Sequence, residues 1–306
     1  MINYYKRSIK NLNIKSLKDY KEDCIILVSS PEEKELDNLA SRFNLERDLL
    51  SDALDPYEVP RMELEKNAVY AFARIPSEIT GRTSTIPLLI IVGNRFLMLV
   101  AKKDLDFLFK DLRKCKNFFT TQQTKSFLQI FGEIQTDYRQ MLTKINKKIN
   151  YFSLNMDEIK DKDIANFINF EITLNEFLSA LIPIRHTLNN TSHGKILSFS
   201  SDDEEILEDL RLQNEQLIER CKSNLTNSTN LRQAYEIIST SRLNRTMKLL
   251  TGMTVILALP TMVTSFYGMN VALPFAQSPF VFWGIVLFIF ALVGVLFIAF
   301  RGRKLL

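Results

Sequence analysis

The sequence predicts an α+β domain, built from a small sheet with helices, followed by long helices and two C-terminal transmembrane helices. Three observations support this prediction. Residues 249–300 contain no Asp, Glu, Lys or Arg, whereas the chain before them is densely charged. No Pro or Gly interrupts residues 201–251. The β-rich runs are confined to about the first hundred residues, where turn residues separate them.

The N-terminal α/β domain is predicted to span residues 1–120. It begins with a strand at Cys24–Ser29. A helix is expected to follow, with Ser30 as its N-cap, Pro31 at its first position and a Glu that closes a capping box. A second helical piece is expected at residues 46–54, where Pro56 ends it.

A sheet is expected in the second half of this domain. Ala68–Ile75 is predicted to be a strand, and two apolar runs at 85–92 and 95–101 form a hairpin with Gly93-Asn94 as its tight turn. A GxGxxG motif and a P-loop are both absent from the sequence, so a nucleotide-binding fold is not expected.

Residues 121–200 are predicted to form a helical pair, from about 122 to 152 and from about 156 to 189. A stalk helix is then predicted for residues 201–248, with acidic residues in its first turn. Its heptad positions predict packing against copies or neighbouring helices, and they are Leu210, Leu217, Asn224, Leu231 and Ile238. Continued to residue 266, this helix would have about 66 residues and a length of roughly 100 Å.

The predicted membrane domain covers residues 249–306. Its first span is expected at about 249–266, an outer loop at 267–279, and its second span at about 280–300, each run being near the 20 residues that cross hydrocarbon. Basic residues flank both spans on one side, which should be cytoplasmic, and they are Arg242, Arg245, Lys248, Arg301, Arg303 and Lys304. We therefore expect a multi-pass protein of the cell membrane, in contact with lipid, with both termini in the cytoplasm.

The first span carries a stripe of polar and small side chains. Its members recur three or four residues apart and are Asn244, Met247, Thr251, Thr254, Ala258, Thr261 and Ser265. On a helix they occupy a sector of about 100°. Such a stripe indicates either a helix–helix contact or the wall of a pore. Because two spans cannot enclose a pathway, a pore would need a ring of first spans from several copies.

Other functional classes find little support in the sequence. A net charge of +4, scattered along the chain, does not favour nucleic acid as a partner. The three cysteines form no CxxC pair, which argues against a disulfide framework or a zinc site. His186 and His193 are the only histidines and have no metal-ligand pattern around them. An enzyme is therefore not expected.

A four-residue motif follows the first span directly: Tyr267, Gly268, Met269 and Asn270. With this motif between two C-terminal spans, behind a long charged helix, the chain resembles the CorA family of magnesium and cobalt transport proteins. The resemblance implies a homopentamer with a funnel-shaped cytoplasmic part and a pore lined by the first span. It also implies uptake of Mg²⁺, with Co²⁺ and Ni²⁺ as further substrates, across the cytoplasmic membrane. Asn270 oxygens would then hydrogen-bond the water shell of a hexahydrated ion, and Gly268 would let the loop aim them inward.

The resemblance also implies roles for individual residues. Pore positions of the family map onto Asn244, Met247, Leu250, Ala258 and Thr261, with Met247 and Leu250 as an apolar constriction. The spacing argument instead places Thr251 where the family suggests Leu250. Regulation by intracellular Mg²⁺ bound between subunits would use Asp209 and Asp52, since two facing carboxylates repel when empty and attract through a cation.

Two alternatives stay open. The chain also resembles zinc transporters of the ZntB type, although Met269 favours the Mg²⁺ branch. From a different class, it could be a non-conducting, membrane-anchored oligomeric scaffold or sensor, which would gain nothing from the hydroxyl stripe or Asn270. One departure bears on ion capture and on the choice of ion. The outer loop at 271–279 has no acidic residue, whereas relatives commonly carry one there.

Overall fold

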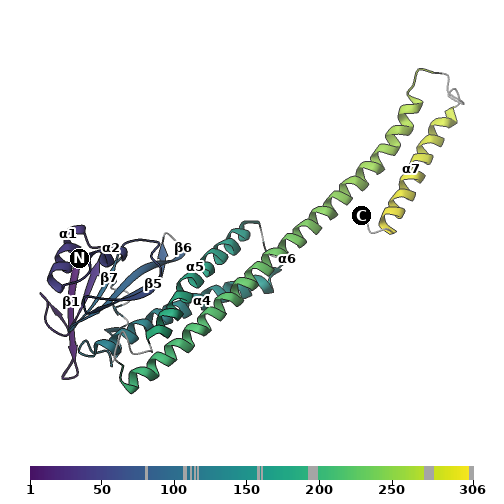
Figure 1. Cartoon of the computed structure of the whole chain (residues 1–306). Helices are drawn as coiled ribbons and strands as arrows, with labels where there is room; N and C mark the ends of the chain where they lie inside the picture. Colours follow the sequence, from purple (N-terminus) through teal and green to yellow (C-terminus); the bar gives the residue numbers. More distant parts are fainter. Residues whose placement is uncertain are drawn as a thin grey trace. The chain divides into compact units, whose positions relative to one another are not determined.

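The computed structural model describes residues 1–79, 82–105, 109–110, 112–113, 115, 117–156, 159, 161–191, 199–271 and 279–302. The chain divides into two compact units, Met1–Leu231 and Arg232–Leu306. Figure 1 shows the elements of both along the chain. We describe each unit by itself.

The first unit contains a seven-stranded sheet in the order β2-β1-β3-β7-β6-β5-β4. Among the described strands, β3 and β7 pair in parallel and the other neighbours are antiparallel. The strands are β1 (Ile2–Ser8), β2 (Asn11–Leu17), β3 (Cys24–Ser29), β4 (Arg61–Glu65), β5 (Ala68–Ile79), β6 (Arg82–Gly93) and β7 (Phe96–Ala101). The α+β class predicted for this part of the chain is thus confirmed. The sheet also contains β1, β2 and β4, which the sequence analysis did not predict.

The β6–β7 hairpin forms as predicted, but its turn lies one residue further along the chain. Gly93 still pairs with Phe96 across the hairpin, so the connecting residues are Asn94 and Arg95. Arg95 takes the left-handed conformation, with φ of 63°. The ring of Phe96 covers Gly93, and a side-chain Cβ built on Gly93 would lie 2.1 Å from its Cζ. Gly93 is therefore needed for close packing within the ladder.

Helix α1 (Glu33–Phe43) begins later than the sequence suggested, so the prediction of Ser30 as N-cap is wrong. Ser30 has φ of 47°, and its N–H and hydroxyl donate to the carbonyls of Ala101 and Lys102 at the end of β7. These bonds hold Ser30 against the sheet, away from the helix. Glu32 is the N-cap instead and forms a capping box with Glu35. The second helix, α2 (Arg47–Asp52), follows directly.

Helices cover both faces of the sheet. On one face α1 and α2 bury a cluster that includes Leu36, Leu50, Tyr70 and Met98. On the other face lie α4 (Gln123–Leu154) and α5 (Asp161–Thr191). Two hydroxyls fix them to the strands: Tyr138 Oη donates to the Arg74 carbonyl at 2.9 Å, and Thr173 Oγ1 donates to the Thr83 carbonyl at 3.0 Å.

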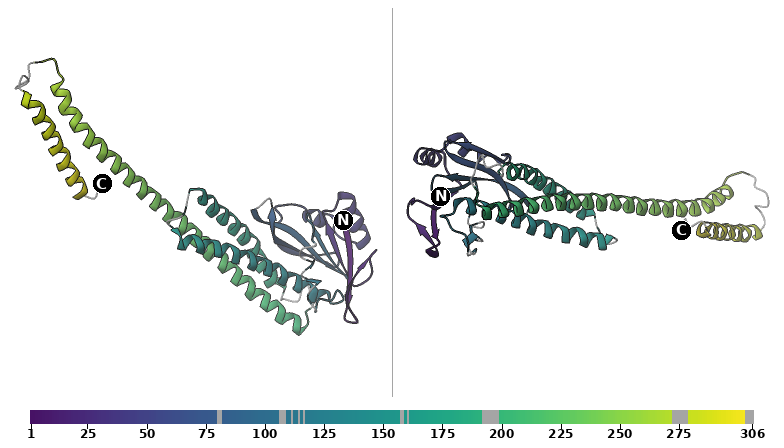
Figure 2. Two further views of the ribbon diagram at one scale, coloured as in Figure 1. Left: turned by 180° about the vertical axis from the view of Figure 1, so that it is seen from behind. Right: turned by 60° about the horizontal axis from the view of Figure 1, so that its bottom comes forward.

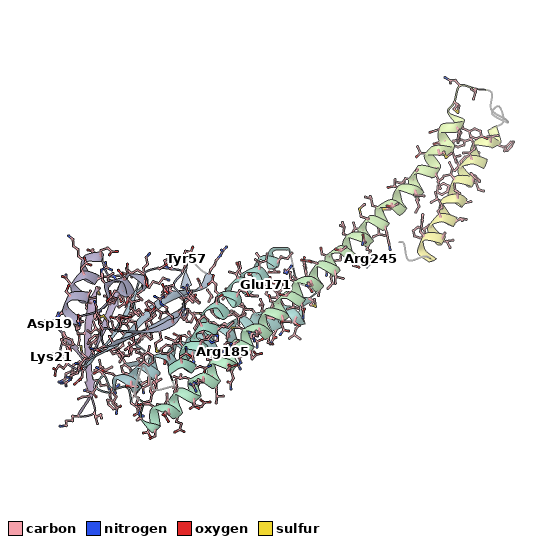
Figure 3. All side chains as sticks on the ribbon, in the orientation of Figure 1. Asp19, Lys21, Tyr57, Glu171, Arg185 and Arg245 are labelled. Carbon is pink, nitrogen blue, oxygen red and sulfur yellow. The ribbon has the colours of Figure 1, made fainter. Side chains whose placement is uncertain are left out.

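Helix α6 (Ser201–Tyr267) runs without interruption from the first unit into the second. Its N-terminal part packs against α4 and α5 (Figure 2). The Gln135 amide donates to the Leu210 carbonyl at 2.8 Å, and the Asn214 amide donates to the Leu181 carbonyl at 3.0 Å. Arg185 on α5, labelled in Figure 3, reaches Glu215 at 3.4 Å.

The predicted heptad seam is buried within the same chain. Leu210, Leu217, Asn224 and Leu231 are all buried in the single chain, where α6 packs on α4 and α5. The heptad pattern allowed packing against other copies of the chain or against neighbouring helices. The neighbouring helices α4 and α5 of the same chain cover this part of the seam.

Within the described part of the chain, three helices are long and apolar enough to cross a membrane, and two of them match the predicted spans. The apolar windows of α6 and of α7 (Pro279–Gly302) are 6% and 0% buried in the chain, whereas that of α5 is 44% buried. The apolar residues of α5 therefore serve the core of the first unit. Those of α6 and α7 have no such cover, as expected for residues that face lipid or other copies.

The heptad packing predicts a stability difference between two leucines of α6. Leu217→Ala should lower the free energy of unfolding by about 2–4 kcal/mol, because it leaves a cavity beside α4 and α5. Leu212→Ala, at a position that is 54% exposed, should cost less than about 0.5 kcal/mol. Both free energies are measured by urea unfolding of the full-length protein in detergent, followed by far-UV circular dichroism. Equal losses would contradict the intramolecular packing of the seam.

Candidate ion pathway

The predicted polar stripe lies on an uncovered face of α6. Every member is exposed in the single chain: Asn244, Met247, Thr251, Thr254, Ala258, Thr261 and Ser265. Leu250, the alternative to Thr251, is also exposed, at 59%. The stripe thus has no partner within the described part of the chain that buries it.

Helix α7 runs alongside the C-terminal part of α6 (Figures 1 and 2). The less exposed residues of α6 in this region include Leu249, Gly252, Ile256, Leu259 and Val263, and those of α7 include Val281, Ile285, Ile289, Leu292 and Leu296. Each set recurs at helical spacing, which indicates that the two sets face each other. At 100° per residue, the α6 set lies roughly opposite the polar stripe. Helix α7 therefore leaves the stripe free.

Two of the three threonine hydroxyls of the stripe donate their protons to carbonyls of their own helix. Thr254 Oγ1 donates to the Leu250 carbonyl and Thr261 Oγ1 donates to the Leu257 carbonyl, both at 2.9 Å. A hydroxyl has one proton to donate and two lone pairs. The lone pairs of these side chains are thus left as acceptors for groups outside the helix, such as the water shell of a cation.

The motif residues end α6. The N–H of Gly268 donates to the Thr264 carbonyl at 3.0 Å, and the N–H of Met269 donates to the Phe266 carbonyl at 3.3 Å. Gly268 does not adopt a positive φ, and a Cβ there would make only ordinary contacts. The backbone as it stands does not require a glycine. Asn270 and its neighbours Tyr267 and Met269 are exposed. The acid-free loop lies mostly outside the described residues, at 272–278.

Pro260 lies inside α6, in the middle of the first span, and the sequence analysis did not use it. Because Pro has no N–H, the turn before it loses one helical hydrogen bond. The Pro260 carbonyl accepts from the Thr264 hydroxyl at 3.1 Å. The carbonyl that loses its helical donor is that of Ile256, four residues before Pro260, so the Thr264 bond involves a different group. The sequence signal that could have pointed to Pro260 is the presence of a proline within the uncharged run of the first span.

The basic flank of the first span is exposed at Arg242, Arg245 and Lys248. Arg245 projects from α6 ahead of the apolar run (Figure 3). Of the flank after the second span, Arg303 and Lys304 and the side chain of Arg301 fall outside the described part.

Asp52, predicted as a regulatory ligand, already has a cationic partner in its own chain. Arg61 Nη2 lies 2.8 Å from Asp52 Oδ2, and the same guanidinium pairs with Glu58 and Glu63. Arg61 also lies 4.2 Å from the centre of the Phe72 ring. Burial lowers the pKa of Arg61, but its hydrogen bonds to Glu63 and Asp52 outweigh this, and the pKa is raised overall. Sequence reasoning missed Arg61, because β4 was not predicted.

Asp209 is exposed on α6. Asp52 ends α2, over one face of the sheet, whereas α6 packs on the helices of the other face. Within the described residues no group of three or more His, Cys, Asp or Glu side chains is placed to hold a metal ion. Carboxylate oxygens are the donors that Mg²⁺ prefers, so both residues fit such an ion chemically, but one chain does not assemble a complete site.

Comparison with known proteins supplies the wider context. Residues 22–303 match the family described as CorA-like Mg²⁺ transporter protein. A cobalt/magnesium transport protein CorA of Methanocaldococcus jannaschii is 25% identical over 285 residues, which cover 89% of this chain and 87% of that protein.

Solved structures share the fold. The complete structure of the CorA magnesium transporter from M. jannaschii matches with a TM-score of 0.83 and 22% identity, covering 98% of this chain and 97% of the other. The cytoplasmic domain of ZntB from Vibrio parahaemolyticus matches with a TM-score of 0.63 and 9% identity, covering 78% of this chain and 98% of that domain. The likeness to both shows the fold.

The opposite placement of the stripe and α7 predicts how single cysteines should react. Thr254→Cys and Thr261→Cys should react with a water-soluble thiol reagent at least about tenfold faster than Ile256→Cys, because thiolates form readily only in contact with water. The reaction is followed in lipid vesicles by the mass of the labelled protein. Slower labelling at the two stripe positions than at Ile256 would contradict a hydrated face.

The native cysteines set the background for this measurement. Cys115 is exposed, so the labelling experiment uses a Cys115→Ser background. Cys24 and Cys221 are buried. Burial raises the pKa of Cys24 and raises that of Cys221 to about 12. Both therefore stay protonated and slow to react at neutral pH.

Proposed function

We propose that this chain, which belongs to the CorA-like Mg²⁺ transporter family, forms a homo-oligomeric channel, a pentamer by analogy, that takes up Mg²⁺ across the cytoplasmic membrane. Co²⁺ and Ni²⁺ are the further substrates that we propose. The family consists of transporters rather than enzymes. The name of the M. jannaschii relative, a cobalt/magnesium transport protein, supports Mg²⁺ and Co²⁺. Ni²⁺ is proposed from the family resemblance alone.

The observation that carries the proposal is the uncovered polar stripe of α6, on the side away from α7. In hydrocarbon the Asn244 amide and the remaining lone pairs of the hydroxyls would have no partner, so these groups need either water or copies of the same helix. A closed ring of α6 helices satisfies both needs, because neighbouring copies flank the stripe and water fills the centre. In this arrangement α7 forms the outer, lipid-facing layer.

Ion passage follows from the chemistry of the stripe. We propose that Mg²⁺, which sheds water reluctantly, enters as a hydrated ion whose water protons are accepted by Asn270 at the mouth and by Thr261 and Asn244 further along. Met247 and Leu250 or Thr251 then form the constriction, which excludes water in the closed state. The motif residues Tyr267, Gly268 and Met269 position the entrance.

The parts of the chain take separate roles in this proposal. Residues 1–120 and the helical pair at 121–200 form the cytoplasmic part, residues 201–248 the stalk, and residues 249–306 the membrane domain, with both termini in the cytoplasm. Mg²⁺ that binds between Asp209 of one copy and Asp52 of the next stabilises the closed ring. At Asp52 the ion must compete with Arg61, whose Nη2 lies 2.8 Å away.

The selectivity role of Asn270 is tested by flux. Asn270→Ala should reduce Mg²⁺ and Co²⁺ flux into proteoliposomes about tenfold or more, because each copy loses an acceptor worth about 1 kcal/mol to the hydrated ion. Val271→Ala, at the next exposed position, serves as the matched control and should keep most of the flux. If Asn270→Ala conducted as well as the wild type, Asn270 would have no part in selectivity. An absence of cation flux in the wild type would favour the scaffold alternative.

The sensor is tested by proteolysis with and without Mg²⁺ at millimolar concentration, roughly the range of weak carboxylate sites. Mg²⁺ should protect the first unit of the wild type from cleavage, and Asp209→Lys should abolish that protection, since an ammonium group cannot ligate a cation. Glu205→Lys, an exposed charge reversal one turn earlier on α6, is the control and should stay protected. Protection that survives Asp209→Lys would eliminate this sensor assignment.

A further inference from the structure

A cleft lies in the first unit, away from the residues that we assign to ion passage and sensing. It has a volume of about 600 Å³ and lies between α4, α5 and the end of the β5–β6 hairpin. A smaller hollow of about 330 Å³ adjoins it and shares Lys147, Lys148, Asn166 and Phe170. We call the two together the basic cleft. Their combined size is in the range of small-molecule sites, which is about 300–1,000 Å³.

One wall of the basic cleft is a stripe of cations on α4. Lys144, Lys147 and Lys148 fall on one side of the helix, and Arg82 of β6 adds a fourth cation. No acidic residue occurs in α4 after Asp137. Within the described part of the chain, none of these four cations forms an ion pair. The last turn of α4 contains no basic residue, so the helix dipole does not account for the lysines.

The opposite wall is a polar stripe on α5. Asn166, Asn169, Thr173 and Glu176 follow one another three or four residues apart, with the Phe170 side chain among them. The Oε2 atom of Glu176 is buried and has no hydrogen-bond partner among the described residues. Buried polar atoms normally have a partner, so this oxygen calls for a donor from a ligand or from water.

The chemistry of the two walls selects the kind of ligand. Four cations and two carboxylates, Glu78 and Glu176, line the cleft, which leaves a formal surplus of 4 − 2 = +2. Lysine ammonium groups bind phosphate as point charges. Amide and carboxylate side chains on the facing wall suit an organic group that has both donors and acceptors. We propose that the basic cleft binds a nucleoside polyphosphate, with its phosphates on the α4 lysines and its nucleoside against the polar stripe of α5.

The proposal is tested by titration calorimetry on the full-length protein in detergent, with EDTA present so that Mg²⁺ plays no part. ATP, inorganic tripolyphosphate and adenosine are the three probes. ATP should bind most tightly, tripolyphosphate less tightly, and adenosine weakly. Lys144→Gln combined with Lys148→Gln should weaken ATP and tripolyphosphate binding about tenfold or more. Glu176→Gln should weaken ATP binding while leaving tripolyphosphate binding within about twofold, because only ATP has a donor for this oxygen.

A control with the same loss of charge keeps the test specific. Lys15→Gln combined with Lys18→Gln removes two exposed lysines of the first unit elsewhere on its surface and should change ATP affinity less than about twofold. Equal weakening by both double variants, or no heat of ATP binding in the wild type at millimolar concentration, would overturn the site. Tripolyphosphate that bound as tightly as ATP would overturn the nucleoside part. We expect the urea midpoints of the lysine variants to be unchanged, because the lysines are exposed. The midpoint of each variant shows whether it is folded.

Discussion

A polar group in hydrocarbon must find its hydrogen-bond partner inside the protein, and this constraint governs the membrane half of the molecule. The threonines of α6 meet it in part by donating to carbonyls one turn back. Among the described residues, the structure gives no further partner for their lone pairs or for the exposed side chains of Asn244 and Asn270. Our proposal that several copies assemble rests on this imbalance, since the less exposed residues of α6 that face α7 lie roughly opposite the stripe.

In the first unit the same helix, α6, has an apolar face that must be covered. There its apolar heptad positions are buried against α4 and α5, and side-chain amides such as Asn214 find carbonyl partners on those helices. One uninterrupted helix therefore has a covered apolar face in one unit and an uncovered polar face in the other. Because the apolar face of the first part and the polar face of the second part differ, α6 shows little amphipathic character when it is averaged over its whole length.

The long helices were predictable because nothing in the chain competes with them. The predicted end of α6 at residue 266 differs from the observed end by one residue, as expected for a run without Pro or Gly before 252. Local sequence signals gave wrong predictions where tertiary contacts determined the conformation. Ser30 has the side chain of a good N-cap, yet the carbonyls at the end of β7 hold it. Strands β1, β2 and β4 lie at or near the edges of the sheet. Apolar and polar residues do alternate in β4 and in the first five residues of β2, a signal that the prediction left unused. The face of the stripe was predictable from spacing, whereas the Arg61 pairing of Asp52 needed the fold.

The intrahelical bonds of Thr254 and Thr261 also bear on the sign of charge that the helix tolerates. With their protons committed, these side chains present lone pairs alone. A chloride ion beside them would meet electron density and find no proton to hold it, whereas the hydrogens of a metal-bound water point outward and match. A wall of this kind would discriminate against anions without a single formal charge within the membrane.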